Sequence, residues 1–103
     1  MSKKIISKQD VKDINQELKN VIIVKKDGTR EHFNGDKIVV AVGKSASRIL
    51  VKLTREEERA IVNHVKSEII KRGLKEVPIA MMHSMVEAAL VSINEEVAKS
   101  YRD

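Results

Sequence analysis

The sequence predicts an α+β fold in which a four-helix bundle is capped by a small β-hairpin or three-stranded sheet. Three observations lead to this fold class. Apolar residues recur at helical spacing over most of the chain beyond residue 36. Before them, a β-branched run is separated from a second extended segment by a turn signal. Phe33 and Tyr101 are the only Phe, Tyr or Trp residues, so the core must consist of aliphatic and methionine side chains, which favours packed helices over a sheet sandwich.

The first 20 residues differ from the rest, and we expect them to be a leader (residues 1–20) that is loosely ordered or forms a short helix. Val11, Ile14 and Leu18 have helical spacing. A lone, lysine-rich helix of this length is marginal in water without a surface on which to dock. The expected folded domain is therefore residues 21–103.

The first element of the domain is a hairpin over residues 21–33. Its β-branched start is followed by the tight-turn signal Asp27-Gly28 and then by a second extended segment. Val77 precedes Pro78 and therefore avoids helical backbone. Because a two-stranded hairpin is rarely stable alone, the short segment at Val77 is a candidate third strand.

The first helix is expected over about residues 37–50. Asn34 and Asp36 are alternative N-caps for it. Its β-branched residues make it a mediocre helix former, so tertiary packing must stabilise it. Its expected buried stripe consists of Val39, Val42, Ala46, Ile49 and Leu53.

The remaining three helices have recognisable ends. Thr54 and Glu57 match a capping box for the second helix, and Gly73 suits a left-handed stop after it. Asn94 can cap a short last helix that contains Tyr101. The third helix has the clearest apolar stripe in the chain, formed by Ile79, Met82, Val86, Ala89, Leu90 and Ile93.

Composition excludes several classes of function. The chain has no cysteine, which rules out disulfides, thiolate zinc sites and a cysteine nucleophile within it. We find no signal peptide and no apolar run of transmembrane length, and we expect a cytoplasmic protein with no membrane partner. The three histidines, His32, His64 and His83, are scattered without metal-ligand spacing. We therefore expect neither a metal site nor catalysis by this chain.

A net charge of +5 permits a polyanionic partner but does not identify one. The basic residues are spread along the chain and mixed with acidic ones, as on an ordinary solvated surface. Charge alone does not distinguish nucleic acid from nucleotide.

The stretch from Ile23 to Ile38 combines groups that suit a nucleotide. A helix N-terminus presents unpaired N–H groups and partial positive charge, and Asn34 and Lys37 lie at the expected start of the first helix. Lys25 and Lys26 end the adjacent strand and could place ammonium groups around the same phosphate.

Two further side chains of this stretch suit the base and the sugar. Glu31 can accept a hydrogen bond from an exocyclic amine or a ribose hydroxyl. Phe33, together with Ile38, could form a wall against an adenine ring. Each of these residues is also typical of an ordinary strand, core or helix end, and there is no glycine-rich phosphate loop. The residues alone therefore predict an anion site on a helical domain.

The order of these motifs resembles the ATP-cone family. The opening signature of that family is a Lys-Arg-Asp-Gly turn followed at fixed distance by an aromatic or aliphatic residue and Lys-Ile. The later half is similar to the family as well, in a Val-Glu-x-x-Leu helix and a closing Val-Ala-x-x-Tyr segment. The matching residues are Lys25-Lys26-Asp27-Gly28, Phe33, Asp36-Lys37-Ile38, Val86-Glu87, Leu90, Val97-Ala98 and Tyr101-Arg102.

The resemblance implies a regulatory domain that binds ATP or dATP as an allosteric effector, with Mg²⁺ as a candidate companion ion. It implies an N-terminal position in a ribonucleotide reductase, whose overall activity the domain would control through nucleotide-dependent self-association. The expected partners are then the rest of the reductase chain and its other subunits. Carried over by position, the nucleotide contacts are Ile23, Lys25, Lys26, Glu31, Phe33, Asn34, Lys37, Ile38 and His83.

Two features depart from the family pattern. Lys26 stands where the family usually has arginine, which keeps the charge but loses the planar fork for bidentate phosphate contact. In the family the last helix also runs on past the position of Asp103 and can add phosphate contacts.

The alternative is a nucleic-acid-binding or protein-interaction module of a transcriptional regulator. Some ATP-cones belong to a bacterial transcriptional repressor that pairs the cone with a cysteine-liganded zinc ribbon. Because this chain has no cysteine, we do not expect nucleic acid as a partner. A pure interaction domain would use Met81, Met82 and Met85 as an adaptable contact surface.

Overall fold

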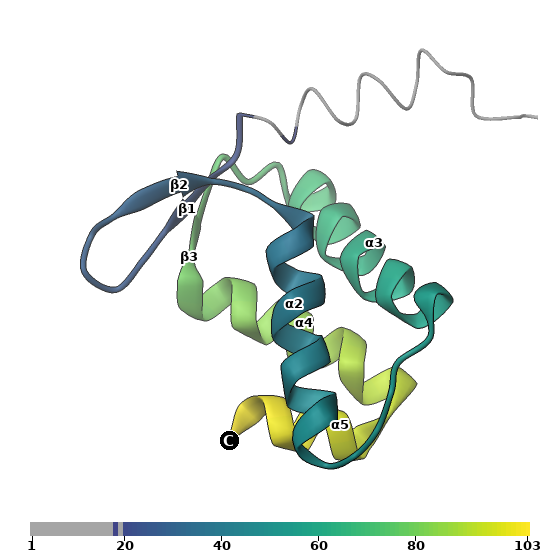
Figure 1. Cartoon of the computed structure of the whole chain (residues 1–103). Coiled ribbons are helices and arrows are strands. Elements are labelled where there is room, and N and C mark those ends of the chain that lie inside the picture. The colour runs from purple at the N-terminus through teal and green to yellow at the C-terminus, as the bar shows by residue number, and fades with distance from the viewer. Residues whose placement is uncertain (1–17, 19) are drawn as a thin grey trace, which may run out of the picture.

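The computed structural model describes residue 18 and residues 20–103, so the expected leader (residues 1–20), with its candidate short helix, lies almost entirely outside the described residues. Figure 1 shows the small sheet at one end of the helices, with the β1–β2 turn projecting away from them and α5 at the other end. The described elements, in chain order, are β1 (Ile22–Val24), β2 (Arg30–His32), α2 (Gly35–Arg48), α3 (Arg55–Arg72), β3 (Glu76–Pro78), α4 (Ile79–Ile93) and α5 (Glu95–Arg102).

The three-stranded sheet has β1 at its centre, in the order β2-β1-β3. β1 pairs antiparallel with β2 and parallel with β3, where Ile23 lies opposite Val77. The hairpin turn has Gly28 at φ +88°, a conformation that glycine adopts without steric cost. Asp27 accepts a hydrogen bond of 2.9 Å from the backbone N–H of Thr29. The predicted hairpin and the candidate third strand at Val77 are both confirmed.

The helix ends follow the expected capping chemistry. The side chain of Asn34 caps α2, which settles the choice between Asn34 and Asp36. Thr54 and Glu57 form the complete capping box of α3, and Gly73 ends that helix at φ +65°. Asn94 caps α5 by accepting from two backbone N–H groups.

The buried stripe of α2 differs from the prediction at both ends. It runs through Ile38, Val42 and Ala46, while Val39 is half-buried and Ile49 is 38% exposed. The helix ends at Arg48, two residues earlier than expected. The chain then turns at the fully exposed Leu50, which has φ +61°, so Ile49 leaves the helical stripe.

The core lies where α4 packs against α3, α5 and the sheet. Met82 and Met85 are buried in it and Met81 is half-buried, so the proposed methionine contact surface is wrong: these side chains fill the interior. The predicted α+β class, with four helices and a small sheet, is confirmed. Within the described residues, no helix combines the length and apolarity needed to cross a membrane.

Candidate functional site

A cavity of about 170 Å³ lies where the hairpin meets α2, α4 and α5, and we call it the hairpin hollow. Six of the nine predicted contact residues line it: Ile23, Glu31, Asn34, Lys37, Ile38 and His83. The remaining lining residues are His32, Ala41, Ile79, Met82, Val86 and Tyr101.

Regular backbone geometry brings these side chains together. Ile23 and Glu31 are cross-strand partners, so both side chains project from the same face of the sheet. α2 and its N-cap contribute residues 34, 37, 38 and 41, at the spacing i, i+3, i+4, i+7 that defines one face of a helix. α4 contributes residues 79, 82, 83 and 86 at the same spacing. Each helix thus presents a single face to the hollow.

The floor of the hollow belongs to the hydrophobic core. Ile23, Ile38, Met82 and Val86 are all buried there, with at most 7% of their surface exposed. A flat, largely apolar group could therefore enter the hollow and be desolvated on this side.

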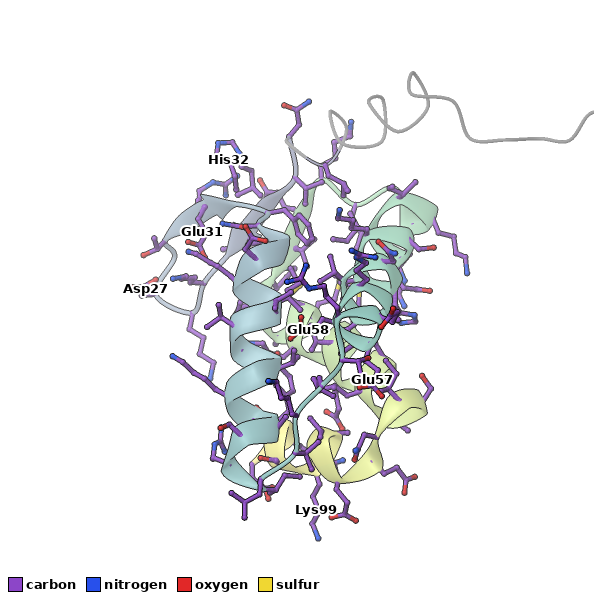
Figure 2. All side chains as sticks on the ribbon, turned by 45° about the vertical axis from the view of Figure 1, so that its right-hand side comes forward. Asp27, Glu31, His32, Glu57, Glu58 and Lys99 are labelled. Atoms are coloured by element: carbon purple, nitrogen blue, oxygen red, sulfur yellow. The ribbon has the colours of Figure 1, made fainter. Side chains whose placement is uncertain are left out.

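A carboxylate between two ammonium groups marks the hairpin end of the rim. Glu31 accepts a hydrogen bond of 2.7 Å from Lys37 Nζ, and Lys25 Nζ lies 3.5 Å from its other oxygen. The hydrogen bond from Lys37, assisted by the charge of Lys25, holds the pKa of the Glu31 carboxyl below its ordinary value. Figure 2 shows Glu31 on the hairpin beside the first turn of α2, with Asp27 farther out at the turn. The cluster orients two cations at the mouth of the hollow.

Two rings mark the opposite end of the hollow. His83 and Tyr101 form an edge-to-face pair, with ring centroids 5.8 Å apart and an interplanar angle of 89°. Burial and the negative charge of Glu87 raise the pKa of the Tyr101 hydroxyl. Beyond this pair lies a second, more polar cavity of about 460 Å³, which shares Ala41, His83 and Tyr101 with the hairpin hollow and is also lined by Lys44, Ser45, Arg48, Glu87 and Arg102.

Three predicted residues do not line the hairpin hollow. Lys25 reaches its rim through Glu31, whereas Lys26 is an exposed residue of the hairpin turn. Phe33 follows the end of β2 at His32, and its backbone N–H still donates to the Val21 carbonyl at 3.1 Å, but it lines a different cavity that borders another side of α2. The structure does not bring Phe33 and Ile38 together as walls of one cavity.

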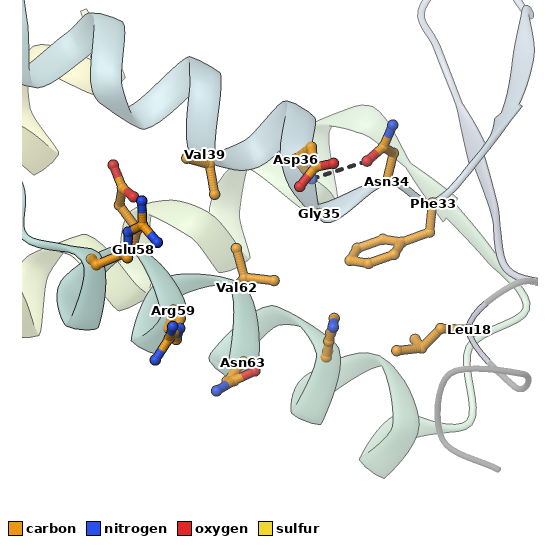
Figure 3. Close-up of a pocket in the computed structure, with 12 residues that line it drawn as sticks. Leu18, Phe33, Asn34, Gly35, Asp36, Val39, Glu58, Arg59, Val62 and Asn63 are labelled. Atoms are coloured by element: carbon orange, nitrogen blue, oxygen red, sulfur yellow. Dashed lines mark hydrogen bonds between the residues drawn. The ribbon is translucent and has the colours of Figure 1, made fainter. Parts of the chain in front are cut away.

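Phe33 instead lines a groove of about 480 Å³ between α2 and α3, which we call the α2–α3 groove (Figure 3). Phe33, Leu18 and Val62 project into this groove from three different segments. The groove is also lined by Asn34, Gly35, Asp36, Val39, Arg55, Glu58, Arg59, Asn63 and Lys66.

The start of α2 offers less to an anion than the sequence suggested. Asn34 Oδ1 already accepts from the backbone N–H of Asp36, and the Asp36 carboxylate lies in the first turn of the helix. A phosphate near this helix end would meet that negative charge. The ammonium groups of Lys25 and Lys37 are therefore the stronger anion-binding elements of the hairpin.

Sequence reasoning missed Tyr101 as a residue of the hollow. The spacing of residues 79, 82, 83 and 86 could have indicated the face of α4, because it repeats the pattern of α2. No local signal connects Tyr101 with the hairpin, since only the packing of α5 against α2 and α4 brings it there. In the part of the chain that the structure describes, no group of three or more His, Asp or Glu side chains could hold a metal ion.

Comparison with known proteins identifies similarity over most of the chain. The ATP cone domain family matches residues 21–103, and ATP-cone domains bind nucleotides such as ATP and dATP. A transcriptional repressor NrdR of Lactobacillus johnsonii is 36% identical over 75 residues, which cover 73% of this chain and 47% of the repressor. The repressor NrdR of Bacillus cytotoxicus is also 36% identical, over 73% of this chain and 48% of its own length. That of Streptococcus suis is 30% identical over 84% of this chain and 56% of its own length.

These relatives correct part of the functional expectation. They are named as transcriptional repressors, so a ribonucleotide reductase as the parent protein, with its subunits as partners, is wrong. The exclusion of nucleic acid is overturned by the same names. It rested on the absence of cysteine, but the chain spans about half the length of the curated relatives it matches. The expectation that the chain is not an enzyme agrees with relatives that are repressors.

Proposed function

Because the chain belongs to the ATP-cone family, we propose that it is the adenine-nucleotide sensor of a transcriptional regulator. The observation that carries the proposal is the hairpin hollow, in which six of the nine expected contact residues come together from four elements. The nucleotide-binding unit is residues 21–103, preceded by a leader in which Leu18 is buried against it.

The base is proposed to occupy the apolar part of the hollow. A volume of about 170 Å³ is below the roughly 300–1,000 Å³ of pockets that enclose a whole small ligand. The hollow therefore suits one ring system, with the sugar and the phosphates outside it. Ile23 and Ile38 would contact the base, and Asn34 could offer its amide N–H groups, which the helix cap does not use.

The phosphates are proposed to lie at the hairpin rim. Lys25 and Lys37 are held there by Glu31, yet their side chains remain 45% and 62% exposed and can turn to a ligand. Lys26 is close enough in sequence to add a third ammonium group. Mg²⁺ would accompany the triphosphate through phosphate oxygens, as it commonly does.

The output is proposed to be the affinity of the regulator for DNA. The curated relatives are named as transcriptional repressors, and repression of transcription is exerted on DNA. Nucleotide bound at the hollow would favour one state of the regulator, and the difference in affinity between states sets the size of the effect. A cytoplasmic location is part of the same proposal.

Thermal melting with ATP, dATP and GTP tests the proposal. A specific ligand at a hundred times its dissociation constant should stabilise the fold by about 2.7 kcal/mol, which raises Tm by roughly 10 °C or more for a domain of this size. We expect this shift with an adenine nucleotide and a much smaller one with GTP. Equal small shifts with all three nucleotides would contradict the sensor. If the adenine shift is seen but affinity for duplex DNA is the same with and without nucleotide, the sensor stands and its proposed output does not.

A further inference from the structure

Tyr101 is the one Phe, Tyr or Trp side chain that lines the hairpin hollow, and the chain contains only one other, Phe33. Phe33 projects into the α2–α3 groove on the opposite side of α2. We propose that Tyr101 is a base-binding residue, whose ring stacks on the purine while His83 contacts its edge. This inference rests on the proposed function and assigns the aromatic contact to α5 instead of the hairpin.

The geometry of the ring pair leaves an aromatic face for a ligand. In an edge-to-face pair the edge of one ring contacts a face of the other, so whichever ring presents its edge, the contact covers at most one face of Tyr101. Tyr101 is half-buried, with part of its ring in contact with the core and part lining the hollow. A base entering between Ile38 and the rings would therefore meet an aromatic surface without displacing core side chains.

The position of Tyr101 is fixed by its two chain neighbours. Ser100 Oγ donates a hydrogen bond of 2.7 Å to the carbonyl of Ser45 on α2, and both groups are buried. Arg102 forms an ion pair of 2.8 Å with Glu87 on α4. Because α5 is tied to both helices on either side of Tyr101, little conformational freedom remains to be lost when the ring stacks on a ligand.

The chemistry of the ring suits a neutral base beside a polyanion. Burial and the charge of Glu87 raise the pKa of the hydroxyl, so the ring is uncharged at neutral pH and does not repel phosphate. A purine has a large π face and gains more from stacking than a pyrimidine of the same charge. The aromatic contact therefore favours purine nucleotides as a class, and the hydrogen-bonding groups at the hollow select among them.

The sequence itself supplies a specific reporter for this contact. Tyr101 is the only tyrosine, and the chain has no tryptophan. Tyrosine emission therefore comes from Tyr101 alone, and a base stacked on its ring should quench it. We expect saturable quenching by ATP, with the same Kd as calorimetry gives on the same protein, and no quenching by inorganic tripolyphosphate. Absorption of the excitation light by ATP is corrected with free tyrosine at equal concentration.

Two substitutions separate the ring from the packing of α5. Tyr101→Leu keeps an apolar side chain of helical preference but removes the ring. It should weaken ATP binding by roughly 5- to 100-fold, which corresponds to the range measured for loss of one base–aromatic stack. Tyr101→Phe keeps the ring and should retain most of the affinity. Phe33→Leu is the matched aromatic control and should leave both the affinity and the quenching unchanged. Circular dichroism confirms that each variant is folded.

The outcomes distinguish this inference from the proposed function. If calorimetry shows ATP binding but neither quenching nor a loss of affinity in Tyr101→Leu, the stacking role is overturned and the sensor stands. Quenching of equal size by tripolyphosphate also overturns stacking, because charge alone would then explain it. Absence of ATP binding to the unaltered protein overturns both.

Discussion

The two faces of α2 border cavities of very different character. The hairpin hollow, on the side of α4 and α5, has about 170 Å³, and the α2–α3 groove has about 480 Å³. Four apolar residues of the hollow are buried core side chains, whereas the groove has one such residue, Leu18, beside the half-buried Phe33, Val39 and Val62. The smaller cavity thus borders more of the core, and most of the apolar residues that line the larger one are only half-buried.

The size of a cavity therefore does not indicate which chemical groups line it. The groove carries Arg55, Arg59 and Lys66 beside Asp36 and Glu58, a mixture of signs that is common on a solvated surface. In the hollow, each end has an ordered feature: the Lys25–Glu31–Lys37 cluster at one end and the ring pair at the other. Between these ends lies a floor that excludes water, which strengthens both polar contacts and stacking.

The largest expected effect comes from truncating neighbouring residues on the two faces. Ile38→Ala removes a buried side chain from the floor of the hollow and should lower the free energy of unfolding by about 2–5 kcal/mol. Val39→Ala removes a half-buried side chain from the wall of the groove, and its cost should be about 1 kcal/mol or less. Urea unfolding of both variants measures the difference. Equal losses would show that the groove is as much a part of the core as the hollow.

Charge reversal on the two faces gives the next largest effect. Lys37→Glu replaces the cation closest to Glu31 and should weaken ATP binding by roughly 10- to 100-fold, because a charge-assisted hydrogen bond to phosphate is lost and repulsion is added. A glutamate in the first turn of α2 is favoured by the helix dipole, which offsets part of the lost ion pair with Glu31, and circular dichroism checks that the variant is folded. Isothermal titration calorimetry gives the affinity.

Arg59→Glu is the matched control for this prediction. It makes the same change of charge on α3, at an exposed position of the groove, and should leave ATP binding nearly unchanged. If Arg59→Glu weakens binding as strongly as Lys37→Glu, the nucleotide occupies the groove or responds only to net charge. The assignment of the site to the hairpin hollow would then fail.

Features that depend on neighbouring residues could be predicted from the sequence, and features that depend on long-range packing could not. The caps at Asn34, Thr54 and Asn94 and the turn at Gly28 were predictable, because each depends on residues within a few positions. The third strand at Val77 followed from the instability of a lone hairpin. Five of the six predicted contact residues that line the hollow come together because the hairpin and the start of α2 adjoin in sequence, whereas the sixth, His83, was named only through the family resemblance.

The positions of Phe33 and Tyr101, which the sequence did not predict, depend on how the elements pack in three dimensions. Phe33 stands two positions after Glu31, and a continued strand would have kept both on one face. Phe33 instead lines the α2–α3 groove, beyond the last strand residue His32. Tyr101 enters the hollow only through the packing of α5, and no pattern near it in the sequence indicates that contact. The residues of the domain do not identify the protein to which it belongs, and only the relatives corrected the expectation of a ribonucleotide reductase.

The smallest expected effect, and the most local, is the titration of Glu31. Its pKa is lowered in the folded protein, first by the hydrogen bond from Lys37, so its contribution to stability is present above the ordinary value of 4.5 and is lost as pH falls through the lowered one. Lys37→Met removes the main cause and should raise the pKa of Glu31 toward 4.5, with Lys25 still holding it somewhat below. Carboxyl NMR titration measures this shift.

Asp27 is the internal control, since its pKa is lowered first by hydrogen bonding to Thr29 and should not respond to the change at Lys37. If Glu31 does not shift, or Asp27 shifts with it, the cluster does not hold its two cations at the rim as described, and the phosphate-binding end of the hollow must be sought at the ring pair.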